Sequence, residues 1–421
     1  MQLTVKALLN NVHPLKGFVY QDVRLVAVKG SGTKQIQVTI APRKKSKPQC
    51  TQCKQRGSTY DRLPERSFRF VPLWAISVFL LYRPRRVNCE PCGIHVEDMP
   101  WAEGKSPQTK ASMSFLATWA KRLSWAETAR VFQASWDDVR MAVAWVVQYG
   151  LAHQDLSGVT AIGVDEIAYK KGRKFITLVY QLDLGYRRLL WIGEGHTKKT
   201  LESFFNFLGE ARTKQLRFIC SDMWRGFISA IKQHADSALH ILDKFHIVAN
   251  LNKAVDQTRR QEAAALRRKG LAVVLKHARW CVLKRFANLT IKQKGRLKEL
   301  LKLNLATVRA YLLKEEFSRL WKYRSVAWAG KFLDRWCEDA MRSKLDAMKR
   351  QAKTLRQHRE LILNYFRACK ELSSAAVEGL NNKAKVVIRR SYGFRCLDTV
   401  KLALFHTLGR LPEPEQTHRF A

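Results

Sequence analysis

Residues 161–193 read AIGVDEIAYKKGRKFITLVYQLDLGYRRLLWIG, and this stretch decides the fold. Its apolar runs are separated by short polar segments that carry Gly and basic residues. This pattern predicts three successive antiparallel strands, at 161–168, 174–182 and 186–193.

The sequence that follows alternates between helical and strand patterns. It predicts in turn an amphipathic helix, a largely apolar strand, a second helix and a further strand, at 198–211, 216–220, 224–234 and 238–242. Three antiparallel strands followed by alternating helix and strand is the element order of the RNase H-like fold. We therefore expect an α/β catalytic core of that class.

Two acidic residues stand at unusual places in these strands. Asp165 lies in the middle of an apolar strand, where its charge needs a compensating partner such as a metal ion. Asp222 follows the point where another apolar strand ends, a position at which α/β sheets present functional groups. Strand alternation places Glu166 on the face opposite Asp165, so only one of the two is expected in a shared site.

A third carboxylate, Glu378, lies near the start of a predicted helix that opens at Ser373 and Ser374. Any one of these acids alone is more often a helix cap or a salt-bridge partner. As a set they predict a site for two Mg²⁺ or Mn²⁺ ions, which prefer oxygen ligands and keep positions open for substrate phosphate. Two such ions about 4 Å apart serve phosphodiester displacement.

The charge balance points to a polyanionic partner. The 421 residues include 76 Lys and Arg against 35 Asp and Glu, a formal charge of +41. Neutralising nucleic-acid phosphates releases condensed counterions, so DNA or RNA is the natural partner. No apolar run reaches the length of about 18 residues that a membrane span needs, and Val71–Tyr82 reads as a strand. We expect a cytoplasmic protein without a signal peptide, associated with the nucleoid when bound to DNA.

Four of the nine cysteines form two CxxC pairs near the N-terminus. Thiolates from Cys50, Cys53, Cys89 and Cys92 would surround one structural Zn²⁺ at about 2.3 Å. Residues 54–88 separate the pairs, more than the roughly 15 to 20 residues of small zinc ribbons, so a hairpin must bring the second pair back. Four unligated thiols are the alternative, and His95 is a substitute ligand.

Helical patterns follow the cysteines. Residues 112–151 predict short helices, one opening with a capping box at Ser124–Glu127 and another restarting after Ala134–Asp138. Two short helices joined by a tight turn in a basic protein indicate a helix-turn-helix that reads DNA. Packing of ordinary helices is the simpler alternative.

The rest of the chain predicts mostly helix. Residues 244–370 nearly lack Gly and Pro and are dense in Lys and Arg, although many of these charges belong to ordinary exposed helix faces. The predicted boundaries are 1–48 for a β/α segment, 49–104 for a zinc-ribbon-like domain with four cysteine ligands, 110–155 for the helix-turn-helix, 158–243 and 371–411 for the catalytic core, 244–370 for an all-α insertion and 412–421 for a tail.

The chain resembles insertion-sequence transposases of the ISL-three family along nearly its whole length. Besides the CxxC pairs, the resemblance is carried by Asp61–Arg66, Leu81–Arg86, Arg122–Trp125, Ile162–Glu166, Ser221–Met223, Asp243–His246 and Glu378–Lys383. One departure is Arg173, where the family often has His.

The resemblance implies an acidic catalytic triad of Asp165, Asp222 and Glu378 in an RNase H-like core interrupted by a helical insertion. Asp243 and His246 match an Asp-x-x-His motif. His246 either contacts DNA near the scissile phosphate or caps a helix. The DNA-contacting side chains that we expect are Arg122, Trp136, Arg140, Lys383, Lys385, Arg389 and Arg390.

These features together predict a transposase that binds the terminal inverted repeats of an insertion sequence. It would cleave DNA with its metal ions, join the freed end to target DNA, and act as a homodimer or higher oligomer. Two alternatives are a DNA-binding regulator without catalysis and a nuclease of the same fold that cuts without joining.

Overall fold

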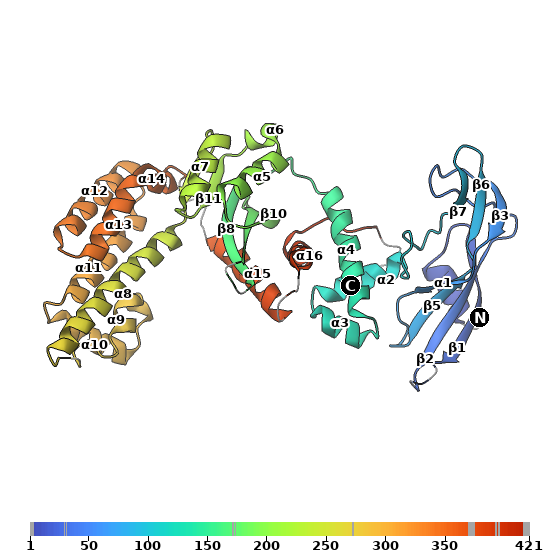
Figure 1. Cartoon of the computed structure of the whole chain (residues 1–421), viewed down its shortest axis with the longest axis horizontal. Helices are drawn as coiled ribbons and strands as arrows, with labels where there is room; N and C mark the ends of the chain where they lie inside the picture. The colour runs from blue at the N-terminus through green and yellow to red at the C-terminus, as the bar shows by residue number, and fades with distance from the viewer. Residues whose placement is uncertain are drawn as a thin grey trace. The chain divides into compact units, whose positions relative to one another are not determined.

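The structure is a computed structural model that describes residues 4–415 except 29, 31, 171, 173, 272, 369–374, 392, 393 and 395. It is a mixed α/β protein in which the described strands form three sheets (Figure 1). Two compact units divide the chain. Met1–Asp155 and Val386–Ala421 form the first, and Leu156–Lys385 form the second.

The first unit opens with helix α1 and a four-stranded sheet. The sheet order is β1-β2-β5-β4, in which β2 and β5 are parallel and the other pairs antiparallel. Its elements are α1 (Val5–Val12), β1 (Phe18–Ala27), β2 (Lys34–Pro42), β4 (Arg66–Arg69) and β5 (Ser77–Tyr82). The predicted strand at 71–82 is shorter than expected, because Trp74 and Ala75 adopt positive φ angles in a tight turn before β5.

A three-stranded sheet carries the cysteines. Its order is β3-β6-β7, built from β3 (Ser58–Arg62), β6 (Arg85–Cys89) and β7 (Gly93–Val96). A buried ion pair ties the start of β6 to the residue after β7, since Arg85 Nη2 lies 2.7 Å from Glu97 Oε2. The hydroxyl of Tyr82 also donates to Glu97, so the buried charges are fully engaged.

Helices complete the first unit. They are α2 (Lys110–Ala120), α3 (Trp125–Val131), α4 (Trp136–Ala152), the end of α15 (Ala375–Arg390) and α16 (Leu397–Leu408). The capping box predicted at Ser124 is present at the start of α3, and Ser135 forms a second one with Asp138 at the start of α4. These caps satisfy the free amide groups at both helix starts and fix the turn between the helices.

The second unit is built around a five-stranded sheet of order β10-β9-β8-β11-β12. Strands β8 (Ala161–Lys170), β9 (Lys174–Gln181) and β10 (Arg188–Glu194) are antiparallel, whereas β11 (Phe218–Ser221) and β12 (Leu239–Leu242) run parallel to β8. Helices α5 (Lys198–Leu208), α6 (Glu210–Thr213) and α7 (Arg225–His234) connect the strands. The predicted helix at 198–211 divides at Gly209, whose φ is 83°.

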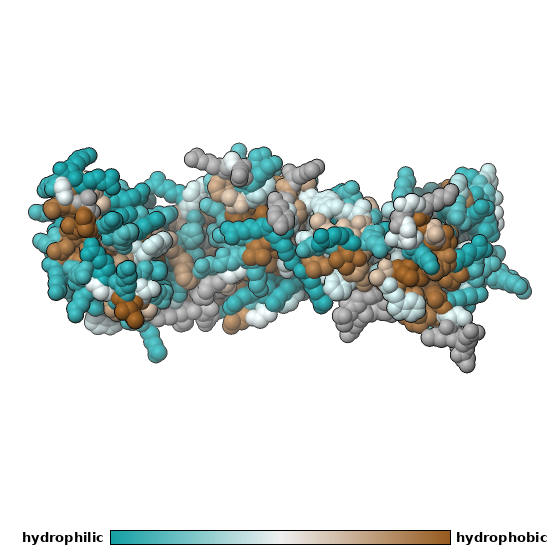
Figure 2. All heavy atoms as spheres, turned by 90° about the horizontal axis from the view of Figure 1, so that it is seen from below, coloured by the Kyte–Doolittle hydropathy of each residue, from teal (hydrophilic) through white to brown (hydrophobic). Residues whose placement is uncertain are grey.

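A run of separate helices follows β12, in the segment 244–370 that the sequence predicts to be mostly helical. Its α-helices are α8 (Lys244–Arg268), α9 (Arg279–Leu283), α10 (Ile291–Leu301), α11 (Ala306–Phe317), α12 (Val326–Arg342), α13 (Asp346–Gln357) and α14 (Arg359–Arg367). Two 3-10 turns, η1 (Phe286–Asn288) and η2 (Ser318–Lys322), interrupt them. Hydrophilic side chains cover much of the surface visible in Figure 2.

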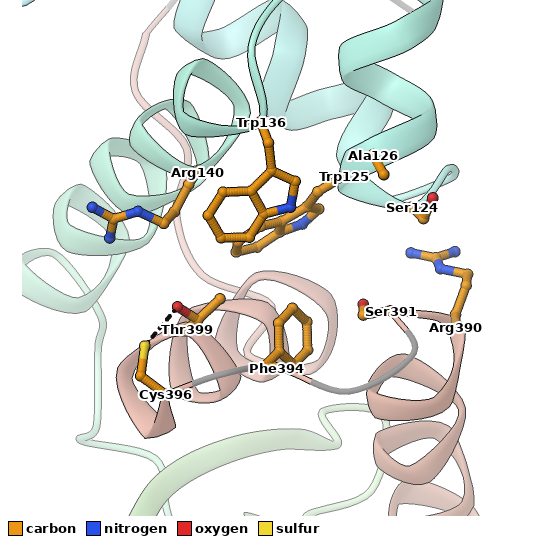
Figure 3. Close-up of a pocket in the computed structure, with 10 residues that line it drawn as sticks. All are labelled: Ser124, Trp125, Ala126, Trp136, Arg140, Arg390, Ser391, Phe394, Cys396 and Thr399. Atoms are coloured by element: carbon orange, nitrogen blue, oxygen red, sulfur yellow. Dashed lines mark hydrogen bonds between the residues drawn. The ribbon is translucent and has the colours of Figure 1, made fainter.

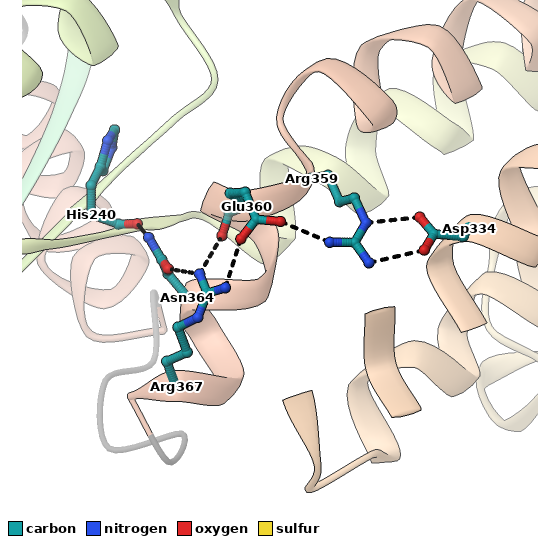
Figure 4. Close-up of polar contacts among 6 residues, drawn as sticks. All are labelled: His240, Asp334, Arg359, Glu360, Asn364 and Arg367. Carbon is teal, nitrogen blue, oxygen red and sulfur yellow. Dashed lines mark hydrogen bonds and ion pairs between the residues drawn. The ribbon is translucent and has the colours of Figure 1, made fainter. Parts of the chain in front are cut away.

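Polar contacts fasten the end of this helical run to the sheet (Figure 4). Asn364 Nδ2 on α14 donates to the backbone oxygen of His240 on β12 at 2.7 Å. Arg367 donates to Asn364 Oδ1 at 2.6 Å and pairs with Glu360. Arg359 forms ion pairs with Glu360 and with Asp334 of α12. The helices are therefore linked to the strand that ends one residue before Asp243.

Candidate functional site

Three aspartates lie on neighbouring strands of the second unit or directly after them: Asp165 in β8, Asp222 one residue after β11, and Asp243 one residue after the edge strand β12. Gly163 of β8 pairs in register with Cys220 of β11, and this register continued by two residues brings Asp165 opposite Asp222. Ser221 of β11 pairs with Leu242 of β12, which brings Asp222 opposite Asp243. Neighbouring residues in register project from the same face of a sheet. The topology therefore gathers these carboxylates on one face.

Hydrogen bonds fix the orientation of Asp165. Its Oδ1 accepts from the backbone N–H of Glu166 at 2.8 Å, and its Oδ2 accepts from the side-chain amide of Asn381 on α15. Tyr180 of β9 donates its hydroxyl to Asn381 Oδ1 at 2.7 Å. Asn381 is buried and lies 216 positions from Asp165, so this contact depends on the tertiary fold.

Gly163, two residues before Asp165, allows α15 to lie close to β8. A Cβ on Gly163 would lie 2.4 Å from Val377 Cγ2 of α15 and 2.9 Å from Leu182 Cδ1. Any larger residue would push α15 away from β8. A glycine inside a strand often marks the close approach of another segment. Gly163 was therefore the sequence feature that could have indicated the packing of α15 against β8.

Among the described residues, no Lys or Arg side chain pairs with Asp165 or Asp222, and His246 is a basic group near both. Burial raises the pKa of Asp165 to about 6, and the nearby Asp222 and Asp243 act in the same direction. Burial likewise raises the pKa of Asp222. Within the described part of the chain, neither carboxylate has a Lys or Arg nitrogen within 4 Å, although the protein carries 76 such residues. A bound cation would supply the missing positive charge.

Glu166 joins the same electrostatic group. Its pKa is raised by burial, then by Asp222 and Asp165, and its Oε2 is buried without a hydrogen-bond partner in the described residues. The expectation from strand alternation was that Glu166 would lie apart from the shared site. The structure places it close enough to Asp222 for the two charges to interact, a relation that the sequence pattern did not reveal.

A cavity of about 210 Å³ lies beside Asp165. Glu378, Asn381, Asn382 and Lys385 line it from one face of α15, where they recur at helical spacing. Asp243, Phe245, His246 and Ala249 line it from the start of α8. Asp165 and the exposed Glu378 therefore both line this cavity. Asp222 is not among its lining residues, but its charge acts on Asp165.

The Asp-x-x-His motif spans the start of α8. Asp243 is the helix cap, because its Oδ1 accepts from the N–H of Phe245 at 2.7 Å. His246 lies one turn further along, with Nε2 4.0 Å from Asp243 Oδ2, and lines the cavity. Asp243 therefore caps α8 and also lines the cavity, and the imidazole of His246 lines the same cavity.

The four N-terminal cysteines converge. The Sγ atoms of Cys50, Cys53, Cys89 and Cys92 lie within 4.8 Å of one another. Hydrogen bonding to the Cys53 backbone lowers the pKa of Cys50 to about 7, whereas burial raises that of Cys89 to about 12. Four adjacent thiolates need a cation, and tetrahedral sulfur coordination suits zinc. His95 lies outside this cluster and its Nε2 is 2.8 Å from the Cys92 carbonyl oxygen.

The side chains expected to contact DNA are found in both units. In the first unit, Arg122 and Arg389 are exposed, Trp136 is 41% exposed, and Arg140 and Arg390 are partly buried. In the second unit, Lys383 and Lys385 are exposed on α15. Lys385 is the one of these that lines the acidic cavity. The helix opening expected at Ser373 and Ser374, and the departure at Arg173, lie outside the described residues.

Tyr180, Asn381 and Gly163 support the site without having been singled out for that role. Asn381 and Gly163 belong to the quoted motifs, but nothing in the sequence marks Tyr180, which reads as one more apolar strand residue. No helix in the part of the chain that the structure describes has the length and hydropathy to span a membrane.

Comparison with known proteins defines the class of this chain. The family of DDE transposases called ISL3, described as transposase, matches residues 162–404, which contain the sheet, the helical run and α15. The transposase for insertion sequence element IS1001 of Bordetella parapertussis is 30% identical over 349 residues, covering 82% of this chain and 85% of that protein. The transposase for element IS1557 of Mycobacterium tuberculosis strain H37Rv is 28% identical over 411 residues, covering 91% and 90%.

The matched sequence therefore defines a DNA transposase, an enzyme class whose DDE family implies the use of divalent metal ions. More narrowly, the chain belongs to the ISL3 family of DDE transposases.

Proposed function

We propose that Asp165, Asp222 and Glu378 form the catalytic triad of this transposase, supported by Asp243 and His246. The observation that carries the proposal is the proximity of Asp165 on β8, Asp222 after β11 and Asp243 after β12, with no Lys or Arg nitrogen within 4 Å of them among the described residues. Glu378 lines the same cavity as Asp165. The strand order supports an RNase H-like core formed by 158–243 and 371–411, with 244–370 as an insertion.

The donor set suits two magnesium or manganese ions, because it consists of carboxylate oxygens with free lone pairs. Such ions, when bound, favour an attacking hydroxyl and stabilise the leaving oxygen of a phosphodiester. The raised pKa values of Asp165 and Asp222 support this fit, since burial and mutual repulsion disfavour both negative charges without a cation.

The protein side chains hold the acids and the DNA in place. Asn381 keeps Asp165 oriented, and Lys385 and His246 lie where a phosphate entering the cavity would meet positive or hydrogen-bonding groups. Water attacks the phosphodiester at the element end, and the 3′ oxygen of the element leaves as a hydroxyl. This 3′-hydroxyl then attacks a phosphodiester of target DNA, and the 3′ oxygen of the target strand is the leaving group. No covalent link between enzyme and DNA is needed.

The other parts of the chain would recognise DNA. Helices α3 and α4, joined by the capped turn at Ser135, form the helix-turn-helix that with the four-cysteine zinc domain binds the terminal inverted repeats. The Lys- and Arg-rich helices after β12 would follow the DNA backbone. Two ends must be cut together, which favours a homodimer or higher oligomer, found at the nucleoid when bound.

Cleavage of a DNA carrying both element ends tests this proposal. Asp165→Asn, Asp222→Asn and Glu378→Gln should each lower magnesium-dependent cleavage by at least about 1000-fold while end binding changes little. Asp236→Asn, an exposed acid after α7, is the matched control and should cleave normally. Near-normal cleavage by any triad variant removes that residue from the site. Strand transfer in the same assay separates a transposase from a nuclease that does not join.

A further inference from the structure

A second cavity, of about 700 Å³, lies within the first unit (Figure 3). It is bounded by the starts of α3 and α4 and by residues near the end of α15 and the start of α16. Its lining is Ser124, Trp125, Ala126, Trp136, Arg140, Arg390, Ser391, Phe394, Cys396 and Thr399. A volume of this size is typical of sites for small ligands, which span roughly 300 to 1,000 Å³.

Three aromatic rings form the apolar part of this cavity. The centroids of Trp125 and Trp136 are 5.6 Å apart with their planes at 49°, and those of Trp125 and Phe394 are 5.6 Å apart at 57°. Neither pair is stacked face to face, so ring faces remain for a planar ligand. Trp125 is buried and fixed, whereas Trp136 is 41% exposed and open to an incoming group.

Two arginines lie on opposite sides of the rings (Figure 3). Arg390 donates from Nη1 to the Arg122 carbonyl at 3.1 Å, and its buried Nε has no partner in the described part of the chain. Within the described residues, Arg140 has one loose ion pair, with Nε 3.9 Å from Asp137 Oδ1. No carboxylate is among the described residues that line the cavity. Both guanidinium groups therefore keep donors for an anion.

The hydroxyl groups of the cavity are already engaged. Ser391 donates to the Val387 carbonyl at 3.2 Å, and Thr399 Oγ1 lies 3.0 Å from Cys396 Sγ. Ser124 caps α3 and bonds Glu127. Aromatic faces and guanidinium donors are what the cavity offers. The ligand that matches both is flat, apolar on its faces and negatively charged at its ends, as a nucleotide is.

We propose that this cavity holds one unpaired base of a DNA strand, stacked on Trp136 and Phe394, with its flanking phosphates at Arg140 and Arg390. A paired base is stacked between its neighbours and shows only its edges, so an extruded or single-stranded base is required. The position at the starts of α3 and α4 places the cavity on the helices that we propose to read DNA. The inference uses the DNA-transposase family of the chain and does not depend on the acidic triad.

Binding to three matched DNAs tests the inference. The full-length protein, without added magnesium, is titrated against a fluorescent duplex that is fully paired, that carries one unpaired thymidine, or that has an abasic site in place of that thymidine. Stacking on aromatic side chains is sequence-tolerant, so an arbitrary sequence serves. Wild-type protein should bind the thymidine duplex about 5- to 150-fold more tightly than the abasic one.

Variants locate the preference in the cavity. Trp136→Ala and Phe394→Ala should bring the ratio of the two affinities close to one, whereas Trp136→Phe, which keeps a ring, should retain most of it. Trp328→Ala removes a 62% exposed tryptophan of α12 and is the matched control, expected to keep the full ratio. A wild-type ratio near one, or a ratio that survives both alanine variants, overturns the inference.

Two further measurements cover other outcomes. If the alanine variants do not fold, judged by circular dichroism, 2-aminopurine at the unpaired position of the DNA reports on wild-type protein alone. Its fluorescence should fall on binding because the base stacks, and a rise overturns the inference.

Thymidine monophosphate added as competitor identifies the ligand source. Loss of the preference at micromolar nucleotide would assign the cavity to a free nucleotide and contradict the DNA proposal.

Discussion

Asn381 shows how one side chain can control the geometry of another. It donates to Asp165 and accepts from the buried hydroxyl of Tyr180, so its amide has one orientation. A residue that orients a metal ligand in this way is typically worth about 10- to 100-fold in metal affinity or activity.

We predict that Asn381→Ala lowers cleavage by about 10- to 100-fold and raises the magnesium concentration needed for half-maximal rate. DNA binding should be nearly unchanged. Magnesium titrations of the cleavage rate check this, with the exposed Asn304→Ala as control. A variant that loses rate at every magnesium concentration without a shift in the midpoint would show that Asn381 acts on stability alone.

His240 gives the second unit a pH-dependent stability. Burial lowers the pKa of His240 to about 4, and His358 acts in the same direction. The unfolded chain binds this proton below about pH 6.5, and the folded chain does so only below about 4. The free energy of unfolding should therefore fall as the pH falls from 6.5 to 4, by up to about 3 kcal/mol from this residue.

The variant His240→Gln removes this titration. Its neighbour, the Ser221 hydroxyl at 2.8 Å, can still form a hydrogen bond with an amide. Urea unfolding at several pH values should give a flatter dependence between pH 6.5 and 4 for the variant than for wild type. Parallel curves would show that His240 is not the group responsible.

At the scale of elements, the contact between α15 and β8 decides whether Glu378 reaches the acidic residues. Gly163→Ala inserts a Cβ that meets Val377 and Leu182 below 3.0 Å. We predict a loss of about 1 to 3 kcal/mol in the free energy of unfolding and a marked loss of cleavage. Gly158→Ala, at a position with nothing within 4 Å, is the control and should change neither. Cleavage at the wild-type rate by Gly163→Ala would contradict a need for this close approach.

We propose that a metal ion holds the four-cysteine cluster together. Cys89→Ser should lower the zinc content of the purified protein from about one ion per chain toward zero and destabilise the sheet of β3, β6 and β7. Atomic absorption measures the metal. Cys281→Ala, a cysteine outside the cluster, should retain it. A wild-type protein without zinc would refute the assignment of this metal.

Periodicity predicted most elements of the second unit, because alternation and helical spacing are local properties. Strands β8, β9 and β11 and helix α7 lie within two residues of their expected bounds. Strand β1 was not predicted. The turn at Trp74 and Ala75 was predicted to be strand, because neither Trp nor Ala is a usual turn residue. The convergence of the cysteines was predictable, since CxxC spacing itself encodes a metal site.

The contacts of the candidate site could not be predicted from local patterns. That Asp222 stands beside Asp165 follows from the parallel pairing of β8 with β11, two strands far apart in the chain. The interaction of Glu166 with Asp222 and the contact of Tyr180 with Asn381 also depend on packing. The cavity lined by Trp125, Trp136 and Phe394 joins helices from distant parts of the sequence.

For the whole molecule, the charge of +41 and the isolated carboxylates have one common explanation. The excess of Lys and Arg suits DNA phosphates, whereas Asp165 and Asp222 have no Lys or Arg partner among the described residues and so remain open to cations. A chain this basic could have neutralised these two aspartates with its own side chains.

Anomalous scattering from manganese tests the central claim most directly. Crystals of the transposase bound to DNA carrying an element end, grown with Mn²⁺, should show two peaks roughly 4 Å apart, in contact with the carboxylates of Asp165, Asp222 and Glu378. Manganese bound elsewhere in such crystals, with these three carboxylates free of it, would contradict the account.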